Sequence, residues 1–286
     1  MLPEGTSPWR GGFPPPASLS GMAGARPEWH QDRMEMISRE TLHAQLRALG
    51  VREGGVLLVH MSYRAVRPVE GGPEGLVQAL TEVLGPEGTL AMPSATGDDD
   101  APFDPAATPN RDDLGVVADL FWRMPGVLRS AHFDAVSARG PQAEWIAGGP
   151  FVLPPAAPGS AIDRIRQAGG QVLLLGVGHH ANTMLHLAEL VGGAPYRSDF
   201  HYIDASGAEV HYGENDSCCE KFELANAWLK AEGLLREGRV GHAEARLMDA
   251  EDLVRIAAEK VRADPLLFLH GAEDGCEECD EARASV

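Results

Sequence analysis

One short segment, Gly176 to Glu189, brings together side chains that can transfer protons. It reads GVGHHANTMLHLAE and follows an apolar run, so we expect it to lie where a strand passes into a helix. Sheets of α/β proteins hold their ligands at such places. Thr183, His186 and Glu189 are spaced i, i+3 and i+6, which puts all three along one broad face of the helix. A hydroxyl, an imidazole and a carboxylate there can form a general base with an orienting partner.

Two other interpretations of this segment stay open from its residues alone. A single histidine on a helix is more often a structural or surface residue than a catalytic one. The His-x-x-Glu pair, close to His179 and His180, could also bind a metal ion through imidazole and carboxylate ligands. The Gly176-x-Gly178 pair lacks the third glycine of a dinucleotide-binding loop. The segment therefore predicts a base without naming a reaction.

The cysteines form a second group with possible chemistry: Cys218, Cys219, Cys276 and Cys279. In a reducing compartment such clustering favours metal binding over disulfides. The two-residue spacing of Cys276 and Cys279 is typical of half a tetrahedral zinc site, which Cys218 and Cys219 could complete, with His270 as a substitute for one of them. A disulfide and free thiols are the alternatives. In each case we expect the cysteines to hold the C-terminal segment in place rather than to catalyse.

The charge balance excludes some classes of partner. The chain has 42 acidic and 24 basic residues, a net charge of −18 and a pI near 4.9. Proteins that bind nucleic acid need a basic surface, so we expect no nucleic-acid partner. No apolar run is long enough to span a bilayer, and the N-terminal region lacks the core of a secretory signal, so we expect no membrane partner and a cytoplasmic location. An acidic surface attracts polycations, although such charge commonly serves solubility alone.

Apolar periodicity indicates which elements must position these side chains. Leu42, Leu46 and Leu49 share one helical face that Gly50 ends, and an apolar run at 171–175 has the length of a buried strand. By the same reasoning we expect helices near 38–49, 73–84, 114–124, 161–167, 182–190, 220–231 and 250–262. We expect strands near 56–59, 89–92, 127–132 and 171–175.

Strands and helices that alternate at short intervals predict an α/β fold, with a mixed, largely parallel sheet flanked by helices. Residues 1–35 are rich in proline and glycine and have no apolar period, so we expect a disordered tail. Residues 36–286 contain no internal repeat and no obvious linker, and we expect them to form one catalytic domain.

Several blocks of the sequence resemble the aminoglycoside 3-N-acetyltransferase family. These blocks occur in order over about residues 36–286, and the C-terminal ones look most like the type IV branch, which modifies apramycin and gentamicin. The blocks read LLVHMSYRAVRPVEGGPEGLVQAL, GTLAMPSATG with PFDPAATP, RSAHFDAVSARG, LLLGVGHHANTMLHLAEL, ENDSCCEKFELANAWLK and DPLLFLHGAEDGCEECDEAR. One departure is Phe133, which stands where the family usually has proline.

The resemblance implies roles for the histidine segment. His186 corresponds to the proposed general base, which takes a proton from the substrate amine. Glu189 would hold the imidazole and favour its protonated form as charge develops. Thr183 would hydrogen-bond near the reacting carbonyl or the leaving thiolate. The implied fold is the antibiotic 3-N-acetyltransferase fold, and the implied reaction is direct transfer of acetyl from acetyl-CoA in a ternary complex.

The resemblance also implies where the two substrates bind. Acetyl-CoA would bind at the loop after residue 59, where backbone N–H groups can hold a pyrophosphate, with Ser62, Tyr63, Arg64 and Arg67 as the side chains involved. The ammonium groups of an aminoglycoside would pair with acidic residues, for which Asp99, Asp216 and Glu214 are the candidates.

Other functions also fit the residues. An acetyltransferase of this fold could act on a different amine, and His186 with Glu189 could activate water on a thioester. A non-catalytic protein could sequester polycations through its acidic surface. The sequence leaves open a homodimer and the range of aminoglycosides accepted.

Overall fold

The computed structural model describes residues 35–98, 100–204 and 206–286. The predicted tail, residues 1–35, therefore lies outside the described residues apart from Glu35. Within the described ranges, no helix has the length and apolar character needed to cross a membrane.

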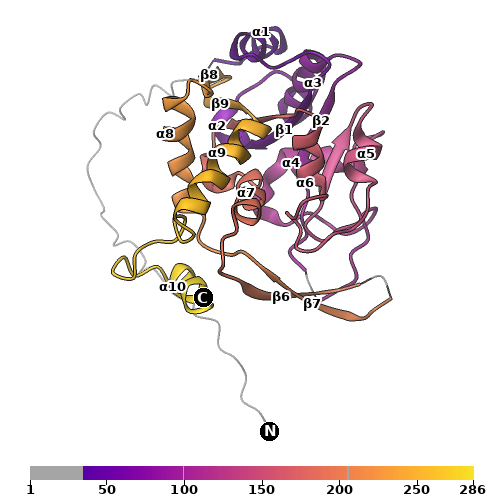
Figure 1. Cartoon of the computed structure of the whole chain (residues 1–286). Coiled ribbons are helices and arrows are strands. Elements are labelled where there is room, and N and C mark those ends of the chain that lie inside the picture. Colours follow the sequence, from indigo (N-terminus) through magenta and orange to yellow (C-terminus); the bar gives the residue numbers. More distant parts are fainter. Residues whose placement is uncertain (1–34, 99, 205) are drawn as a thin grey trace, which may run out of the picture. The chain divides into compact units, whose positions relative to one another are not determined.

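A seven-stranded sheet forms the centre of the domain (Figure 1). Strand β1 pairs in parallel with β2 on one side and β5 on the other, whereas every other pairing is antiparallel. Five strands consequently run in one direction, and only β4 and β9 oppose them, which confirms the mixed, largely parallel sheet. In spatial order the strands are β3 (Leu128–Arg129), β4 (Val136–Arg139), β2 (Thr89–Pro93), β1 (Val56–Met61), β5 (Gln171–Leu175), β9 (Ala243–Asp249) and β8 (Arg236–Val240).

Side chains that alternate along the central strands supply two cores, one on each face of the sheet. Leu57 and Val59 face one core, while Val56 and Leu58 face the other. The first core is covered by α1 (Arg39–Leu49), α3 (Gly72–Leu84) and α4 (Gly115–Trp122). The second is covered by α5 (Ala143–Ala147), α6 (Ala161–Gln167), α7 (Met184–Gly192), α8 (Leu224–Ala231) and α9 (Ala250–Ala263).

Local signals explain the helix ends that the sequence predicted well. Helix α1 begins after Ser38, whose hydroxyl accepts a hydrogen bond from the Thr41 N–H, and it ends at Gly50, whose φ is 100°. A serine cap satisfies an otherwise unpaired N–H, and glycine adopts the left-handed conformation without steric cost. Helix α6 and strand β5 have the predicted bounds.

Several elements were not predicted, among them β4, β8 and β9 of the main sheet and helix α5. A hairpin and a further helix were also missed. Strands β6 (Ser198–Ile203) and β7 (Glu209–Glu214) form a hairpin apart from the main sheet, and α10 (Glu277–Ala284) begins immediately after Cys276 (Figure 1). The hairpin strands carry His, Asp and Glu among their aromatic residues, so they lack an apolar run. Helix α10 is mostly polar and buries only Cys279 and Ala282.

Candidate active site

The turn between β5 and α7 is shaped by two glycines. Gly176 has a φ of 69°, and a Cβ on it would lie 2.5 Å from the Ala65 Cβ. A Cβ on Gly178 would lie 2.0 Å from Glu223 Oε1. Glu223 accepts a hydrogen bond from the His179 N–H and forms an ion pair of 3.0 Å with Arg246 on β9. The turn is thereby fixed to the sheet, and α7 starts at Met184, immediately after Thr183.

His186 and Glu189 form a hydrogen-bonded pair on α7. The distance from His186 Nδ1 to Glu189 Oε2 is 2.9 Å, and the Glu189 side chain is 1% exposed. The other carboxylate oxygen accepts a hydrogen bond from the hydroxyl of Tyr196, which is fully buried. A buried carboxylate with both oxygens occupied fixes the imidazole ring, so Nε2 is left as the nitrogen that can exchange a proton.

Cys219 faces the Nε2 atom of His186, a contact that the sequence analysis did not predict. Its Sγ lies 3.8 Å from His186 Nε2, and Cys219 is not a member of the cysteine cluster described below. Cys219 has a φ of 59°, a conformation uncommon for residues other than glycine. The ring of Phe222, three residues later, contacts the imidazole edge-on at a centroid distance of 5.1 Å.

The surroundings separate the pKa values of the nearby histidines. Burial alone lowers the pKa of His186, but its contacts with Cys219 and Glu189 outweigh burial and raise it well above 6.5. Burial lowers the pKa of His60 to about 3 and, with the charges of Arg246 and His180, that of His179 to about 4. Groups whose pKa values are driven apart can take separate acid and base roles. Of these three histidines, only His186 has surroundings that stabilise its protonated form.

Replacing Glu189 with glutamine should move the acid limb of the kcat/KM–pH profile to lower pH. Only a neutral imidazole accepts a proton, so activity rises as pH passes the His186 pKa, and Glu189 raises that pKa. We also expect the maximum rate to fall at least about tenfold, because the imidazolium loses its counter-charge. A pH profile of both proteins measures this. An acid limb at the same or higher pH in the variant would contradict the role given to Glu189.

Two clefts meet at the turn. The first is lined by His60, Thr183 and Asp134, and the second by Ser62 and Arg246, while Val177 and His180 line both. Thr183 Oγ1 lies 3.5 Å from His60 Nε2, so the hydroxyl is at the wall of the first cleft beside a neutral imidazole. The two clefts share the wall formed by Val177 and His180, whereas His186 itself lines neither of them. Two openings that meet at one turn suit a reaction between two bound substrates.

The residues predicted to bind acetyl-CoA are only partly brought together. Ser62 lines the second cleft, and its N–H donates to Leu175 O at 2.9 Å. Tyr63 packs against the core beneath α1 and α3, and Arg64 and Arg67 are exposed outside both clefts. The loop after β1 continues into α2 (Tyr63–Val66), which is a single helical turn.

Acidic side chains gather near His186. Burial and the Asp134 carboxylate raise the pKa of Glu214 to about 8, and burial raises the pKa of Asp216. The charge of His186 lowers the pKa of both carboxyls and so opposes the effect of burial. Glu214 and Asp216 were predicted from the sequence; Asp134, which comes from the loop before β4, was not. Asp99, the third predicted residue, lies outside the described residues.

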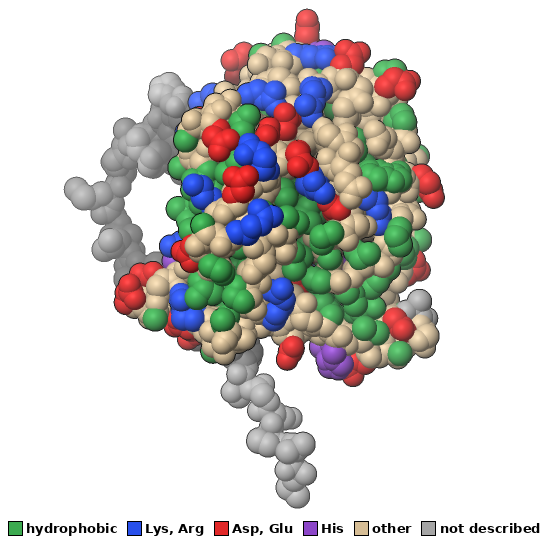
Figure 2. Space-filling view, viewed as in Figure 1, with side chains coloured by type: hydrophobic (Ala, Val, Ile, Leu, Met, Phe, Trp, Pro, Cys, Tyr) green, Lys and Arg blue, Asp and Glu red, His purple; other side chains and the backbone are tan. Residues whose placement is uncertain are grey.

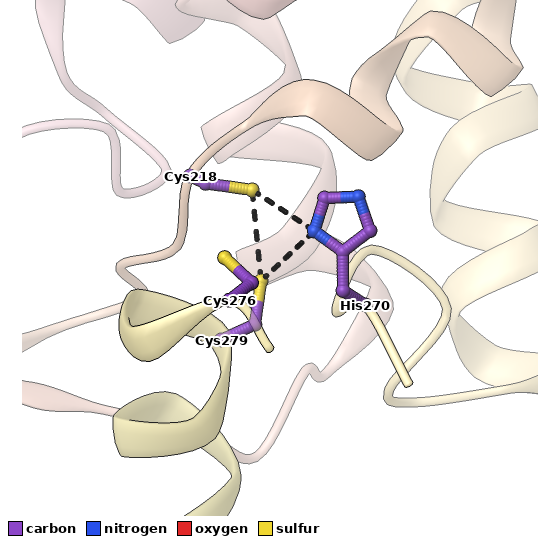
Figure 3. A group of neighbouring side chains, drawn as sticks. All are labelled: Cys218, His270, Cys276 and Cys279. Atoms are coloured by element: carbon purple, nitrogen blue, oxygen red, sulfur yellow. Dashed lines mark hydrogen bonds between the residues drawn. The ribbon is translucent and has the colours of Figure 1, made fainter. Parts of the chain in front are cut away.

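Three of the four cysteines meet in a cluster with a histidine (Figure 3). Cys218 Sγ lies 3.3 Å from His270 Nδ1 and 3.6 Å from Cys279 Sγ, and Cys279 Sγ lies 3.7 Å from His270 Nδ1. With Cys276, the four ligand atoms are all within 4.8 Å of one another. His270 therefore stands in the position that the sequence analysis first assigned to Cys219. The cluster joins the segment after β7 to the start of α10.

The sequence resembles proteins of known activity. The model of the aminoglycoside 3-N-acetyltransferase family matches residues 58–262. Aminoglycoside N(3)-acetyltransferase IV of a Salmonella species is 55% identical over 237 residues, which are 82% of this chain and 91% of that protein.

Solved structures agree with the sequence comparison. A histidine-to-alanine variant of aminoglycoside acetyltransferase AAC(3)-IVa in complex with a gentamicin has a TM-score of 0.88 at 54% identity, covering 90% of this chain and 100% of that one. The same variant with apramycin has a TM-score of 0.81 at 51% identity, with 90% and 100% covered. AAC-IIIb with CoASH has a TM-score of 0.70 at 25% identity, with 80% and 97% covered. The chain belongs to the aminoglycoside 3-N-acetyltransferase family.

Proposed function

We propose that this protein acetylates the 3-amino group of the 2-deoxystreptamine ring of aminoglycoside antibiotics, with acetyl-CoA as donor, and so confers resistance. The observation that carries the proposal is the His186–Glu189 pair at the β5–α7 turn, in a chain 55% identical to aminoglycoside N(3)-acetyltransferase IV. Dependence on acetyl-CoA, a metabolite of the cytoplasm, favours action in that compartment.

His186 serves as the general base in this reaction. Its Nε2 takes a proton from the amine as the nitrogen attacks the thioester carbonyl, so that the N–C bond forms and the C–S bond breaks. The proton then passes to the departing thiolate of coenzyme A. Glu189 stabilises the imidazolium in between, because its buried carboxylate is 2.9 Å from Nδ1. Thr183, at the start of α7, is positioned to donate a hydrogen bond to the carbonyl or to the thiolate.

The acidic side chains bind the ammonium groups of the drug. Glu214, Asp216 and Asp134 supply carboxylates around His186, and Asp99 is a further candidate in the same acidic stretch as Asp98 and Asp100. A cation bound there stabilises the ionised form of Glu214, whose pKa is about 8 without it. On the face shown in Figure 2, basic and acidic side chains are interspersed.

Acetyl-CoA occupies the cleft that Ser62 lines. The complex of AAC-IIIb with CoASH supports a coenzyme A site in this fold. We propose that Ser62 and the backbone of Gly176–Gly178 contact the pantetheine end, and that Arg64, Arg67 and Tyr63 act at the outer end of the molecule, where exposed cations can meet phosphate.

We also propose a structural zinc ion held by Cys218, His270, Cys276 and Cys279. Tetrahedral zinc with Zn–S near 2.3 Å and Zn–N near 2.0 Å requires ligand atoms about 3.5–3.8 Å apart. The distances of 3.6 and 3.7 Å meet that requirement, and the distance of 3.3 Å lies within a few tenths of an ångström of it. Such an ion links two segments 52 residues or more apart in sequence, and its chemistry is structural because all four positions are filled by protein.

Thiol release from acetyl-CoA, with and without gentamicin or apramycin, tests the function, and NMR of the product locates the acetyl group. Drug-dependent release with acetylation at the 3-amino group supports the proposal. Release without any drug would indicate a thioester hydrolase. Binding of the drug without release of the coenzyme A thiol would indicate a polycation-binding protein. Acetylation of amines that are not aminoglycosides, with none of the drugs, would place the substrate outside that class.

A further inference from the structure

A second, apolar hollow lies beside the acidic side chains. Phe133, Phe151, Tyr202, Ile203 and Asp204 line it, and it opens to solvent with a volume of about 320 Å³. We call the part formed by Phe133, Phe151 and Tyr202 the aromatic pocket. None of these residues takes part in the mechanism described above.

The aromatic pocket is built by contacts between the β6–β7 hairpin and two loops of the main domain. The ring of Phe133 stacks on Tyr202 at a centroid distance of 4.7 Å, and Phe151 lies 5.4 Å from Tyr202. Phe133 is buried and fixed by this stacking. Phe151 stacks on His132 at a centroid distance of 4.3 Å and is still 43% exposed. An exposed phenylalanine beside a tyrosine, at an open hollow, is a surface that a ligand ring can cover. Phe103 also lines the hollow, but the Arg129 guanidinium already lies 4.7 Å from its ring.

The aromatic pocket adjoins the acidic side chains through neighbouring residues of one loop and one strand. Phe133 directly precedes Asp134, whose charge acts on Glu214. On the hairpin, Tyr212 contacts Phe133 at 5.6 Å and lies two residues before Glu214, hence on the same face of β7. A molecule whose ammonium groups pair with Asp134 and Glu214 therefore has an aromatic surface next to it along the hairpin.

We propose that the aromatic pocket is an outer subsite that binds a second sugar ring of the aminoglycoside. The C–H face of a pyranose stacks on aromatic rings, and an ammonium group on that ring gains a cation–π contact. The carboxylate of Asp204 at the edge adds charge complementarity for a cationic sugar. The inference rests on the proposed function, because it extends the same site.

Calorimetry and steady-state kinetics with Tyr202→Leu and Phe151→Leu test the subsite. Gentamicin carries sugar rings that 2-deoxystreptamine lacks. We expect the Kd and KM for gentamicin to rise about tenfold, which corresponds to about 1.4 kcal/mol, with little change in kcat or in the KM for acetyl-CoA. The Kd for 2-deoxystreptamine should change far less. Phe151→Leu alters an exposed side chain, so it keeps the test valid if the Tyr202 variant folds poorly.

Phe200→Leu is the matched control. Phe200 lies on the same hairpin and contacts Tyr212 at 5.8 Å, but it does not line the hollow, so its replacement should leave gentamicin binding unchanged. An unchanged Kd in both pocket variants, an equal loss for gentamicin and 2-deoxystreptamine, or the same loss in the control would overturn the subsite. Wild-type protein that fails to acetylate gentamicin would instead overturn the proposed function.

Discussion

Replacing His186 with alanine should lower kcat/KM for aminoglycoside acetylation about 10²–10⁴-fold, the usual contribution of a positioned general base. The amine is mostly protonated at neutral pH, so without the imidazole the proton must leave to water. The Kd of the drug should change little, because its cations pair with Glu214, Asp216 and Asp134. Initial rates of thiol release over a range of drug concentrations measure the effect.

Two controls separate chemistry from folding. His43→Ala replaces a half-buried histidine on α1, far in the sequence from the site, and should leave the rate unchanged. The melting temperature of His186→Ala should stay close to that of the wild type, since the ring is partly exposed. A decrease in kcat/KM of less than about threefold in a folded His186 variant would mean that another group accepts the proton.

Cys279→Ser should abolish zinc binding and lower the free energy of unfolding by roughly 3–5 kcal/mol, at the upper end for one substitution. Cys279 is fully buried and Cys218 half-buried, so losing the ion removes the link between the segment after β7 and α10. Elemental analysis of the purified protein gives the zinc content, and urea unfolding gives the stability.

Cys219→Ser is the matched variant for the zinc prediction, because Cys219 is adjacent in sequence but its Sγ faces His186. We expect it to retain one zinc per chain and nearly wild-type stability. Loss of zinc in this variant would restore Cys219 as a ligand, as the sequence alone suggested. A wild-type protein purified without zinc, and insensitive to added zinc in unfolding experiments, would contradict the structural ion altogether.

The features that sequence analysis predicted depend on local signals. Four apolar residues after Gln171 indicated β5, and the i, i+3 spacing brought His186 and Glu189 together because both lie on one helix. The resemblance to the family supplied the reaction. Helix α7 begins later than expected, at Met184, because the turn first forms a short 3₁₀ segment over His179–Ala181.

The features that the sequence analysis missed depend on contacts between distant segments. Tyr196 holds Glu189 from the loop after α7, and Asp134 reaches Glu214 from another loop; no spacing relates them. The adjacent residues Cys218 and Cys219 have identical side chains, so the sequence does not distinguish them. In the structure Cys218 enters the cluster, and Cys219, in a left-handed conformation, faces His186. The hairpin could have been found from its paired aromatic residues, but their polar neighbours weakened the signal.

The most direct test of the account asks whether acetyl passes straight to the amine. The protein is mixed with an equal amount of acetyl-CoA without drug, and released coenzyme A and the intact mass of the protein are measured; gentamicin is then added. We predict no release and no change in mass at the first step, then release of coenzyme A matched by acetylated gentamicin. One equivalent of coenzyme A released before the drug, with an acetyl group retained on Cys219, would contradict direct transfer and make that thiol the nucleophile.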